Sequence, residues 1–132
     1  MIGKEQYLID TNILIYFFDG KLSEKQRKTI IELFEQSFNI SVISKIEFFG
    51  FKDFFDNEKY ANAKEFVSNA NIISLSDDLI DKIIEIKQQW NLKLGDAIIG
   101  ATAIANSCTI VTRNQKDFEK IAGLKIINPL NE

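Results

Sequence analysis

Short apolar runs alternate along the chain with longer stretches of helical periodicity, and this alternation restricts the fold more than any other feature. The runs predict buried strands over residues 7–10, 39–44, 71–75, 108–112 and 124–128. Helices are expected between them, over 22–38, 58–70, 77–90 and 95–106, with another starting near Asn12. Such alternation favours a parallel sheet covered on both faces. We therefore expect an α/β fold, a three-layer α/β/α sandwich around a mainly parallel sheet of about five strands.

Length and residue usage indicate one domain and restrict its chemistry. The chain has 132 residues, 45% of them hydrophobic, which fits a single domain over residues 1–132. The absence of histidine excludes a Ser-His-Asp triad, a histidine base and an imidazole zinc site. The single cysteine, Cys108, excludes an internal disulfide and a cysteine zinc cluster. An enzyme built from these residues must use carboxylates, lysines or a hard metal ion.

The charge and hydropathy patterns bear on location and partners. No apolar stretch approaches the roughly 20 residues that a membrane span requires, so we expect a soluble, cytoplasmic protein with no membrane partner. The formal net charge is −3, and Arg27 and Arg113 are the only arginines. Because such a chain has no general attraction to nucleic acid, RNA would have to be held by local basic groups or through a cation.

Four acidic residues stand where ligands bind in open parallel sheets, just after strands or at the start of a following helix. Asp10 ends the first predicted strand, and Glu47 follows the second. Asp96 begins the helix 95–106, and Asp117 follows the fourth strand. Because the carboxyl ends of parallel strands share one edge of the sheet, these side chains are expected to converge. Four carboxylates of this kind suit Mg²⁺ or Mn²⁺.

Each acid also has a purely structural interpretation. Asp10 or Asn12 can cap the next helix, and residues 44–47 have the pattern of a capping box. Asp96 suits the positive end of a helix dipole, and residues 114–117 have cap-plus-three spacing. The apolar neighbours of all four favour a shared cation, because unpaired carboxylates held together in such surroundings repel one another.

Two apolar patterns bear on the core and on partners. Phenylalanines gather at residues 17–18 and 48–55, which indicates either core packing or an exposed apolar groove or dimer surface. Helix 77–90, capped by Ser76, carries a stripe that we interpret as core: Leu79, Ile80, Ile83, Ile84, Lys87 and Trp90.

Four sequence stretches occur in the order and context of a known family. They are "LIDTNILI", the Ser44 to Glu47 pattern, "LGDAIIGATA" and "IVTRNQKDFEKIAGLKII". From residue 7 to 129 the chain resembles PIN-domain proteins, and within them the VapC-type toxins of toxin-antitoxin pairs. The combined motifs are far more specific than any one of them.

The resemblance implies a metal-dependent endoribonuclease that acts on tRNA or another structured RNA. Its catalytic and metal-binding residues would be Asp10, Glu47, Asp96 and Asp117, with Mg²⁺ or Mn²⁺ as the cofactor. The supporting polar residues would be Asn12, Thr112 and Asn114, the last also a further candidate for completing the site. The basic residues near the loops that would contact the RNA backbone are Lys45, Lys52, Arg113 and Lys116. The implied partners are a cognate antitoxin and a second copy of the chain.

Three other interpretations remain open at this point. A PIN-like binding module without catalytic activity would retain the acids, and a DNA-directed nuclease of related fold would use them on another substrate. A phosphoaspartate receiver domain is also acidic and doubly wound. It normally needs an adjacent acid pair near the first strand, and no acid adjoins Asp10.

Overall fold

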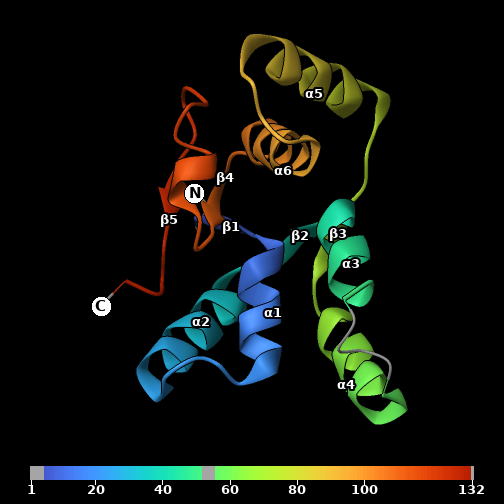
Figure 1. Cartoon of the computed structure of the whole chain (residues 1–132), viewed down its shortest axis with the longest axis vertical. Helices are drawn as coiled ribbons and strands as arrows, with labels where there is room; N and C mark the ends of the chain where they lie inside the picture. Colours follow the sequence, from blue (N-terminus) through green and yellow to red (C-terminus); the bar gives the residue numbers. More distant parts are fainter. Residues whose placement is uncertain (1–4, 52–55, 132) are drawn as a thin grey trace.

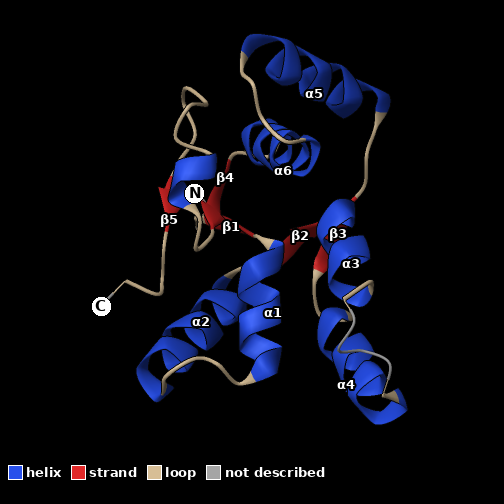
Figure 2. Cartoon of the chain, in the orientation of Figure 1, coloured by secondary structure: helices blue, strands red, loops and turns tan. Residues whose placement is uncertain are grey.

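The computed structural model describes residues 5–51 and 56–131, and five parallel strands form its centre. Along the sheet the order is β3-β2-β1-β4-β5, so the first strand lies in the middle (Figure 2). The strands are β1 (Gln6–Ile9), β2 (Asn39–Ser41), β3 (Asn71–Ile73), β4 (Cys108–Val111) and β5 (Ile126–Ile127). Every pairing is parallel, which confirms the predicted sheet.

Helices cover both faces of this sheet (Figure 1). They are α1 (Thr11–Asp19), α2 (Glu24–Gln36), α3 (Val42–Phe49), α4 (Asn57–Val67), α5 (Asp77–Gln89) and α6 (Leu94–Ala105), with a 3-10 turn η2 (Gln115–Asp117) after β4. Helices α5 and α6 pack together on one side, while α1, α2 and α4 lie on the other. None of the helices in the described ranges has the length and apolar character to cross a membrane.

The core has two halves because each central strand buries both of its faces. Leu8 and Ile110 pack with α5 and α6, whereas Ile9 and Val111 pack with α1, α2 and α4. All four side chains are completely buried. This period-two division of continuous apolar strands produces the predicted three-layer α/β/α sandwich.

The second strand is shorter than predicted, and this changes the role of the next helix. The expected strand 39–44 ends at Ser41, whose hydroxyl accepts a hydrogen bond from the Ile43 amide and caps α3. Ser44 is therefore inside the helix, and the capping box predicted over 44–47 is wrong. Since Ser44 and Glu47 are three residues apart in a helix, they lie on the same face.

The other boundaries differ from the predictions by a few residues at the ends of elements. Strand β3 ends at Ile73 rather than residue 75, and β5 holds two residues of the predicted 124–128. Helix α2 begins after a capping box formed by Ser23 and Gln26. The predicted cap of α5 is confirmed, because Ser76 Oγ accepts from the Leu79 amide at 3.1 Å.

The apolar stripe on α5 is only partly core. Leu79 and Ile83 are buried, but Ile80 and Ile84 are 40% and 48% exposed, and Ile86 takes up the inner position instead. The prediction that the whole stripe is core is therefore wrong. A periodicity of 3.6 residues leaves such flanking positions at the margin of the buried face.

The phenylalanines of the described residues pack inward. Phe48 is completely buried, and a set of partly buried rings surrounds it on the side of α1, α2 and α4: Phe17, Phe18, Phe34, Phe38, Phe49, Phe51 and Phe66. Adjacent rings stack or meet edge to face, as at Phe34 and Phe38 with centroids 4.5 Å apart. This supports core packing, while Phe54 and Phe55 lie outside the described residues.

Candidate active site

A cleft of about 290 Å³ opens at the carboxyl end of the central strands. It is lined by residues that follow β1 and β4 and by the first turns of α1 and α6, with contributions from α3 and η2. The four predicted acids are all among its lining residues: Asp10, Glu47, Asp96 and Asp117. Side chains that are widely separated in the sequence thus meet at one edge of the sheet.

Asp10 is the buried acid of the cleft and directly follows β1. Its Oδ1 accepts from the Thr11 amide at 2.8 Å, so Asp10 also caps α1. Its Oδ2 accepts from Thr112 Oγ1 at 2.8 Å and from Asn12 Nδ2 at 3.0 Å. Burial raises the pKa of Asp10 and the charge of Glu47 adds to the rise, while these hydrogen bonds oppose it. The carboxylate is therefore oriented by donors on three residues.

Glu47 reaches the cleft from α3 and is held by α1. Thr11 Oγ1 lies 2.7 Å from Glu47 Oε1 and 3.0 Å from the oxygen of the buried Ser44. A Cβ added to Gly95 would lie 3.6 Å from Glu47 Oε2, so this carboxylate stands against the first turn of α6. The exposed Glu47 is thereby brought beside the position of Asp96.

Asp96 is in the first turn of α6, and the charges of the other three acids act on it. Its pKa is raised to about 6, first by burial and then by the charges of Asp117 and Asp10, with Glu47 adding less. Lys93, which also lines the cleft, opposes the rise. The site is a cluster of like charges whose protonation states depend on one another.

The supporting residues predicted from sequence lie around Asp10. Asn12 and Thr112 both donate to its Oδ2. Thr112 Oγ1 in turn accepts from the Asn114 amide at 3.0 Å. Asn114 lines the cleft at the start of η2, but its side chain makes no capping hydrogen bond there, contrary to the structural interpretation of residues 114–117.

The predicted basic residues are only partly brought to the cleft. Arg113 adjoins it, with its amide donating to Asn12 Oδ1 at 3.2 Å, and Lys116 is exposed in η2. Lys45 lines a separate hollow between α3 and α4 and does not line the cleft. Lys52 lies outside the described residues.

Three residues of the site were missed at the sequence level as functional positions. The Thr11 hydroxyl contacts both Glu47 Oε1 and Ser44 Oγ, and Lys93 is a cation that lines the cleft. The three-residue spacing of Ser44 and Glu47 was a usable signal once read as one helix face. Lys93 had no comparable signal, because only the turn before α6 directs it to the acids.

The donor set can be compared with what a metal ion requires. Carboxylate oxygens are the ligands that Mg²⁺ and Mn²⁺ prefer, and the like charges that raise the pKa of Asp96 would be relieved by a cation. The chemistry of the residues therefore fits such an ion. Within residues 5–51 and 56–131, no three acidic or cysteine side chains are already placed as a ligand set.

Comparison with known proteins connects this cleft with a family. The family model described as the PIN domain matches residues 7–124, which includes all four acids. The chain belongs to the PIN-domain family. Membership in it excludes the receiver-domain interpretation of the acids. None of the curated protein sequences matches the chain significantly.

Solved structures give the same result for this PIN-domain chain. One chain of a toxin-antitoxin complex from Klebsiella pneumoniae is 34% identical, with 93% of this chain and 97% of that chain covered and a TM-score of 0.75. VapBC2 from Rickettsia felis, bound to a DNA fragment from the promoter, gives 24% identity, 93% and 98% coverage and a TM-score of 0.79. DNA-bound VapBC from Salmonella typhimurium is 20% identical, with 96% of this chain and 99% of that chain covered and a TM-score of 0.82. The predicted resemblance to PIN-domain proteins of the VapC type is confirmed.

Proposed function

We propose that this PIN-domain protein is a metal-dependent endoribonuclease and the toxin of a toxin-antitoxin pair. The observation that carries the proposal is the convergence of Asp10, Glu47, Asp96 and Asp117 on one cleft, where their charges raise the pKa of Asp96. Such a cluster is costly by itself and becomes favourable with a divalent cation. Nucleases of the PIN family provide the functional context for it.

Each acid has a part in the proposed site. Asp10, oriented by three donors, and Asp96 would hold Mg²⁺ or Mn²⁺. Glu47 and Asp117, both exposed at the cleft, would complete the ligand set and orient the attacking water. A bound ion of this kind supplies a water of lowered pKa and polarises the phosphoryl oxygen for in-line attack. Thr11 keeps the Glu47 carboxylate turned toward the cleft.

The substrate is proposed to be tRNA or another structured RNA, by resemblance to the family. Lys93 at the cleft and Arg113 and Lys116 beside it are placed to offset phosphate charge. Lys45 would contact RNA only if the strand also reached the hollow between α3 and α4. Because the net charge is −3, the cation at the carboxylates and these few basic groups must supply the attraction.

The proposed partners are a cognate antitoxin and a second copy of the chain, in the cytoplasm. The Klebsiella pneumoniae relative comes from a toxin-antitoxin complex, which supports the first. Exposed aliphatic side chains support an apolar interface, namely Ile46, Leu94, Ile80 and Ile84. Scattering or sedimentation of the pure protein would show a dimer if the second proposal holds.

The test of the activity is cleavage of total RNA by the pure protein with Mg²⁺, with Mn²⁺ and with EDTA. We expect defined fragments with either metal, none with EDTA and none from Asp10→Asn. Cleavage that persists in Asp10→Asn would place the activity elsewhere. An intact RNA pool under all conditions would favour the inert binding module, and preferential cleavage of competing single-stranded DNA would favour the DNA-directed alternative.

A further inference from the structure

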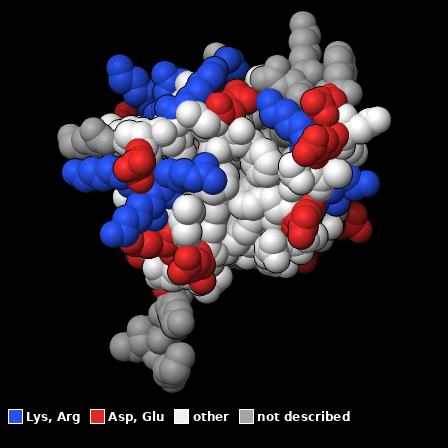
Figure 3. All heavy atoms as spheres, turned by 90° about the horizontal axis from the view of Figure 1, so that it is seen from below, with Lys and Arg blue, Asp and Glu red and all other residues white. Residues whose placement is uncertain are grey.

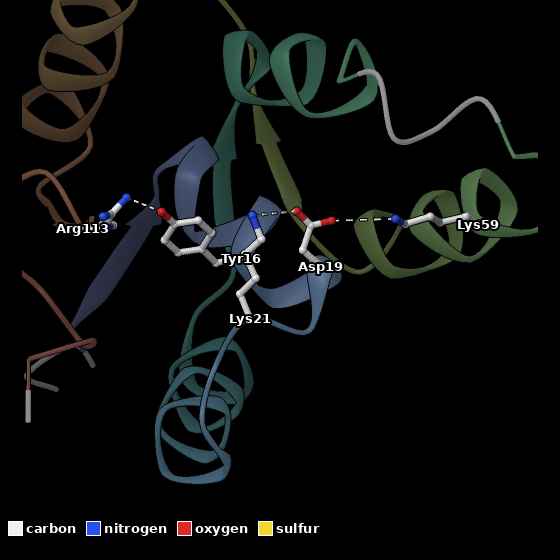
Figure 4. A network of polar contacts seen from close by, with 5 residues as sticks. All are labelled: Tyr16, Asp19, Lys21, Lys59 and Arg113. Atoms are coloured by element: carbon white, nitrogen blue, oxygen red, sulfur yellow. Dashed lines mark hydrogen bonds and ion pairs between the residues drawn. The ribbon is translucent and has the colours of Figure 1, made fainter.

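Arg113 is anchored beside the acidic cleft although its side chain is exposed to solvent. Its amide donates to Asn12 Oδ1 at 3.2 Å, and its carbonyl accepts from Asn128 Nδ2 at 3.2 Å. Its guanidinium Nη1 donates to the hydroxyl of Tyr16 on α1 (Figure 4). Exposed arginines usually sample many rotamers, whereas this one is held through backbone and side chain alike.

Among the described residues the guanidinium has no carboxylate as an ion-pair partner, although the next residue in the chain, Asn114, lines the acidic cleft. No ion pair links Arg113 to an Asp or Glu within residues 5–51 and 56–131. Tyr16 offers it a neutral acceptor, and the guanidinium carbon lies 5.0 Å from the centre of the Tyr16 ring. A cation held this way keeps its full charge available for an anion, because it is not already neutralised.

A row of groups continues from Arg113 along α1, away from the cleft. Lys21 Nζ lies 5.8 Å from the centre of the Tyr16 ring and 3.9 Å from Asp19 Oδ2. Lys59 of α4 reaches the other oxygen of Asp19 at 3.7 Å (Figure 4). The face that carries α1, α2 and α4 has an uncharged middle with basic and acidic side chains at its margins (Figure 3). The row therefore offers cations on both sides of a partly exposed aromatic ring.

We propose that Arg113 is a preorganised phosphate clamp, that Tyr16 is the residue that positions it, and that single-stranded RNA leaves the cleft over Tyr16 toward Lys21. Alternation of cations with an aromatic ring is the usual way in which proteins track a single strand without reading its sequence. Asn12 links the clamp to the cleft, since it donates to Asp10 Oδ2 and accepts from the Arg113 amide. The inference rests on the proposed nuclease function and adds the path that the RNA strand takes out of the cleft.

The first test measures binding of a fluorescent single-stranded oligoribonucleotide to the full chain in EDTA, over a series of salt concentrations. Arg113→Gln is expected to weaken binding roughly tenfold and to lower the slope of log K against log salt by about 0.7, the value for one phosphate contact on a single strand. Arg27→Gln is the matched control, because it removes the same charge from α2, where that guanidinium lies 4.2 Å from the centre of the Phe17 ring. Equal losses in both variants would overturn the proposal.

The second test separates positioning from general stability. Tyr16→Phe keeps the ring and removes the hydroxyl, so it should weaken binding about threefold in the wild-type background and have no effect in the Arg113→Gln background. In cleavage assays it should raise KM and leave kcat unchanged. The control is Tyr60→Phe on α4. Tyr60 also lies beside a cation, with Lys64 Nζ 5.4 Å from the centre of its ring.

The results also distinguish this inference from the function on which it rests. If the wild-type protein cleaves RNA but Arg113→Gln and Tyr16→Phe bind it as tightly as wild type, the clamp is wrong and the nuclease stands. If Tyr16→Phe weakens RNA binding equally in the wild-type and Arg113→Gln backgrounds, Tyr16 does not act through Arg113. If the wild-type protein neither binds nor cleaves RNA, the proposed function itself fails.

Discussion

Two hollows lie at opposite ends of β1 and β4, and the larger one has the weaker case for chemistry. The amino-end hollow measures about 520 Å³, and Glu5 is the only carboxylate among the described residues that line it. The carboxyl-end cleft measures about 290 Å³ and gathers four acids. In parallel sheets the carboxyl edge is where loops deliver polar residues, so charge density rather than volume marks the site.

The same hydrogen bond occurs in both hollows with different surroundings. Thr109 Oγ1 donates to Glu5 Oε1 at 2.7 Å, and Thr11 Oγ1 lies at the same distance from Glu47 Oε1. Glu5 also accepts from the Tyr7 hydroxyl at 3.4 Å, and Lys125 shares its hollow. Glu47 instead faces other carboxylates and raises the pKa of Asp10. Glu5 therefore has hydrogen-bond donors for its charge, whereas the acids of the carboxyl-end cleft would be stabilised by a cation.

The largest expected effect is the loss of activity when a charge is removed from the cleft. Asp96→Asn should lower metal-dependent RNA cleavage by about 100-fold or more, because ligand charge at the reacting phosphate is lost. Glu5→Gln, the same change at the other end of the sheet, should stay within about twofold of wild type. Comparable losses of cleavage rate in the two variants would contradict the assignment of the chemistry to the carboxyl-end cleft.

Metal binding is expected to stabilise the fold through the cleft alone. At a metal concentration about 100 times Kd, Mn²⁺ or Mg²⁺ should add roughly 2.7 kcal/mol to the free energy of unfolding, seen as a higher Tm. Asp10→Asn should abolish this shift and Glu5→Gln should retain it. The metal site would have to be sought elsewhere if Asp10→Asn kept the full shift.

Without metal, the protein should lose stability as pH rises from about 4 to about 6. The pKa of Asp96 is raised from 3.8 to about 6, so in this range the native state holds a proton that the unfolded chain has released. Since water partly screens this side chain, the loss is on the order of 1 kcal/mol. Denaturant unfolding in EDTA would measure it. The slope should flatten in Asp96→Asn and persist in Glu5→Gln; an unchanged slope in Asp96→Asn would contradict the assignment.

The smallest effects concern the two matched threonines. Thr11→Val and Thr109→Val should each lower the free energy of unfolding by about 1 kcal/mol, the net value of a lost hydrogen bond. Only Thr11→Val should reduce cleavage, by up to about tenfold, because it releases the Glu47 carboxylate. Parallel activity assays and denaturant unfolding would separate the two effects, and a slower Thr109→Val enzyme would contradict them.

Much of the architecture was predictable from local pattern. The strands contain short continuous apolar runs such as residues 7–9, and their burial on both faces follows from the helices between them. The ends of elements were less predictable. The hydroxyl of Ser41 stops β2 and starts α3, but Ser44 offers the same chemistry three residues later, so the pattern alone selected the wrong cap.

The candidate site divides in the same way. Asp10 directly follows β1 and Asp96 lies in the first turn of α6, so local sequence was informative for both. Glu47 and Asp117 were predicted as acids that follow strands, although Glu47 lies late in α3 and Asp117 at the end of η2. The role of Thr11 was not predictable, because its hydroxyl contacts the carboxylate of Glu47 in another helix. Hydrogen bonds between residues far apart in sequence leave no periodic signal.

The sequence by itself determined the α/β class, the exclusion of histidine chemistry and the four candidate acids, because these depend on composition and on short-range periodicity. Only the tertiary structure decided that Asp10 both caps α1 and faces the cleft, that Glu47 is tied to Thr11, and that the pKa of Asp96 rises to about 6. The physical reason is that burial and Coulomb interaction depend on distance in space. The parallel order of the strands creates those distances.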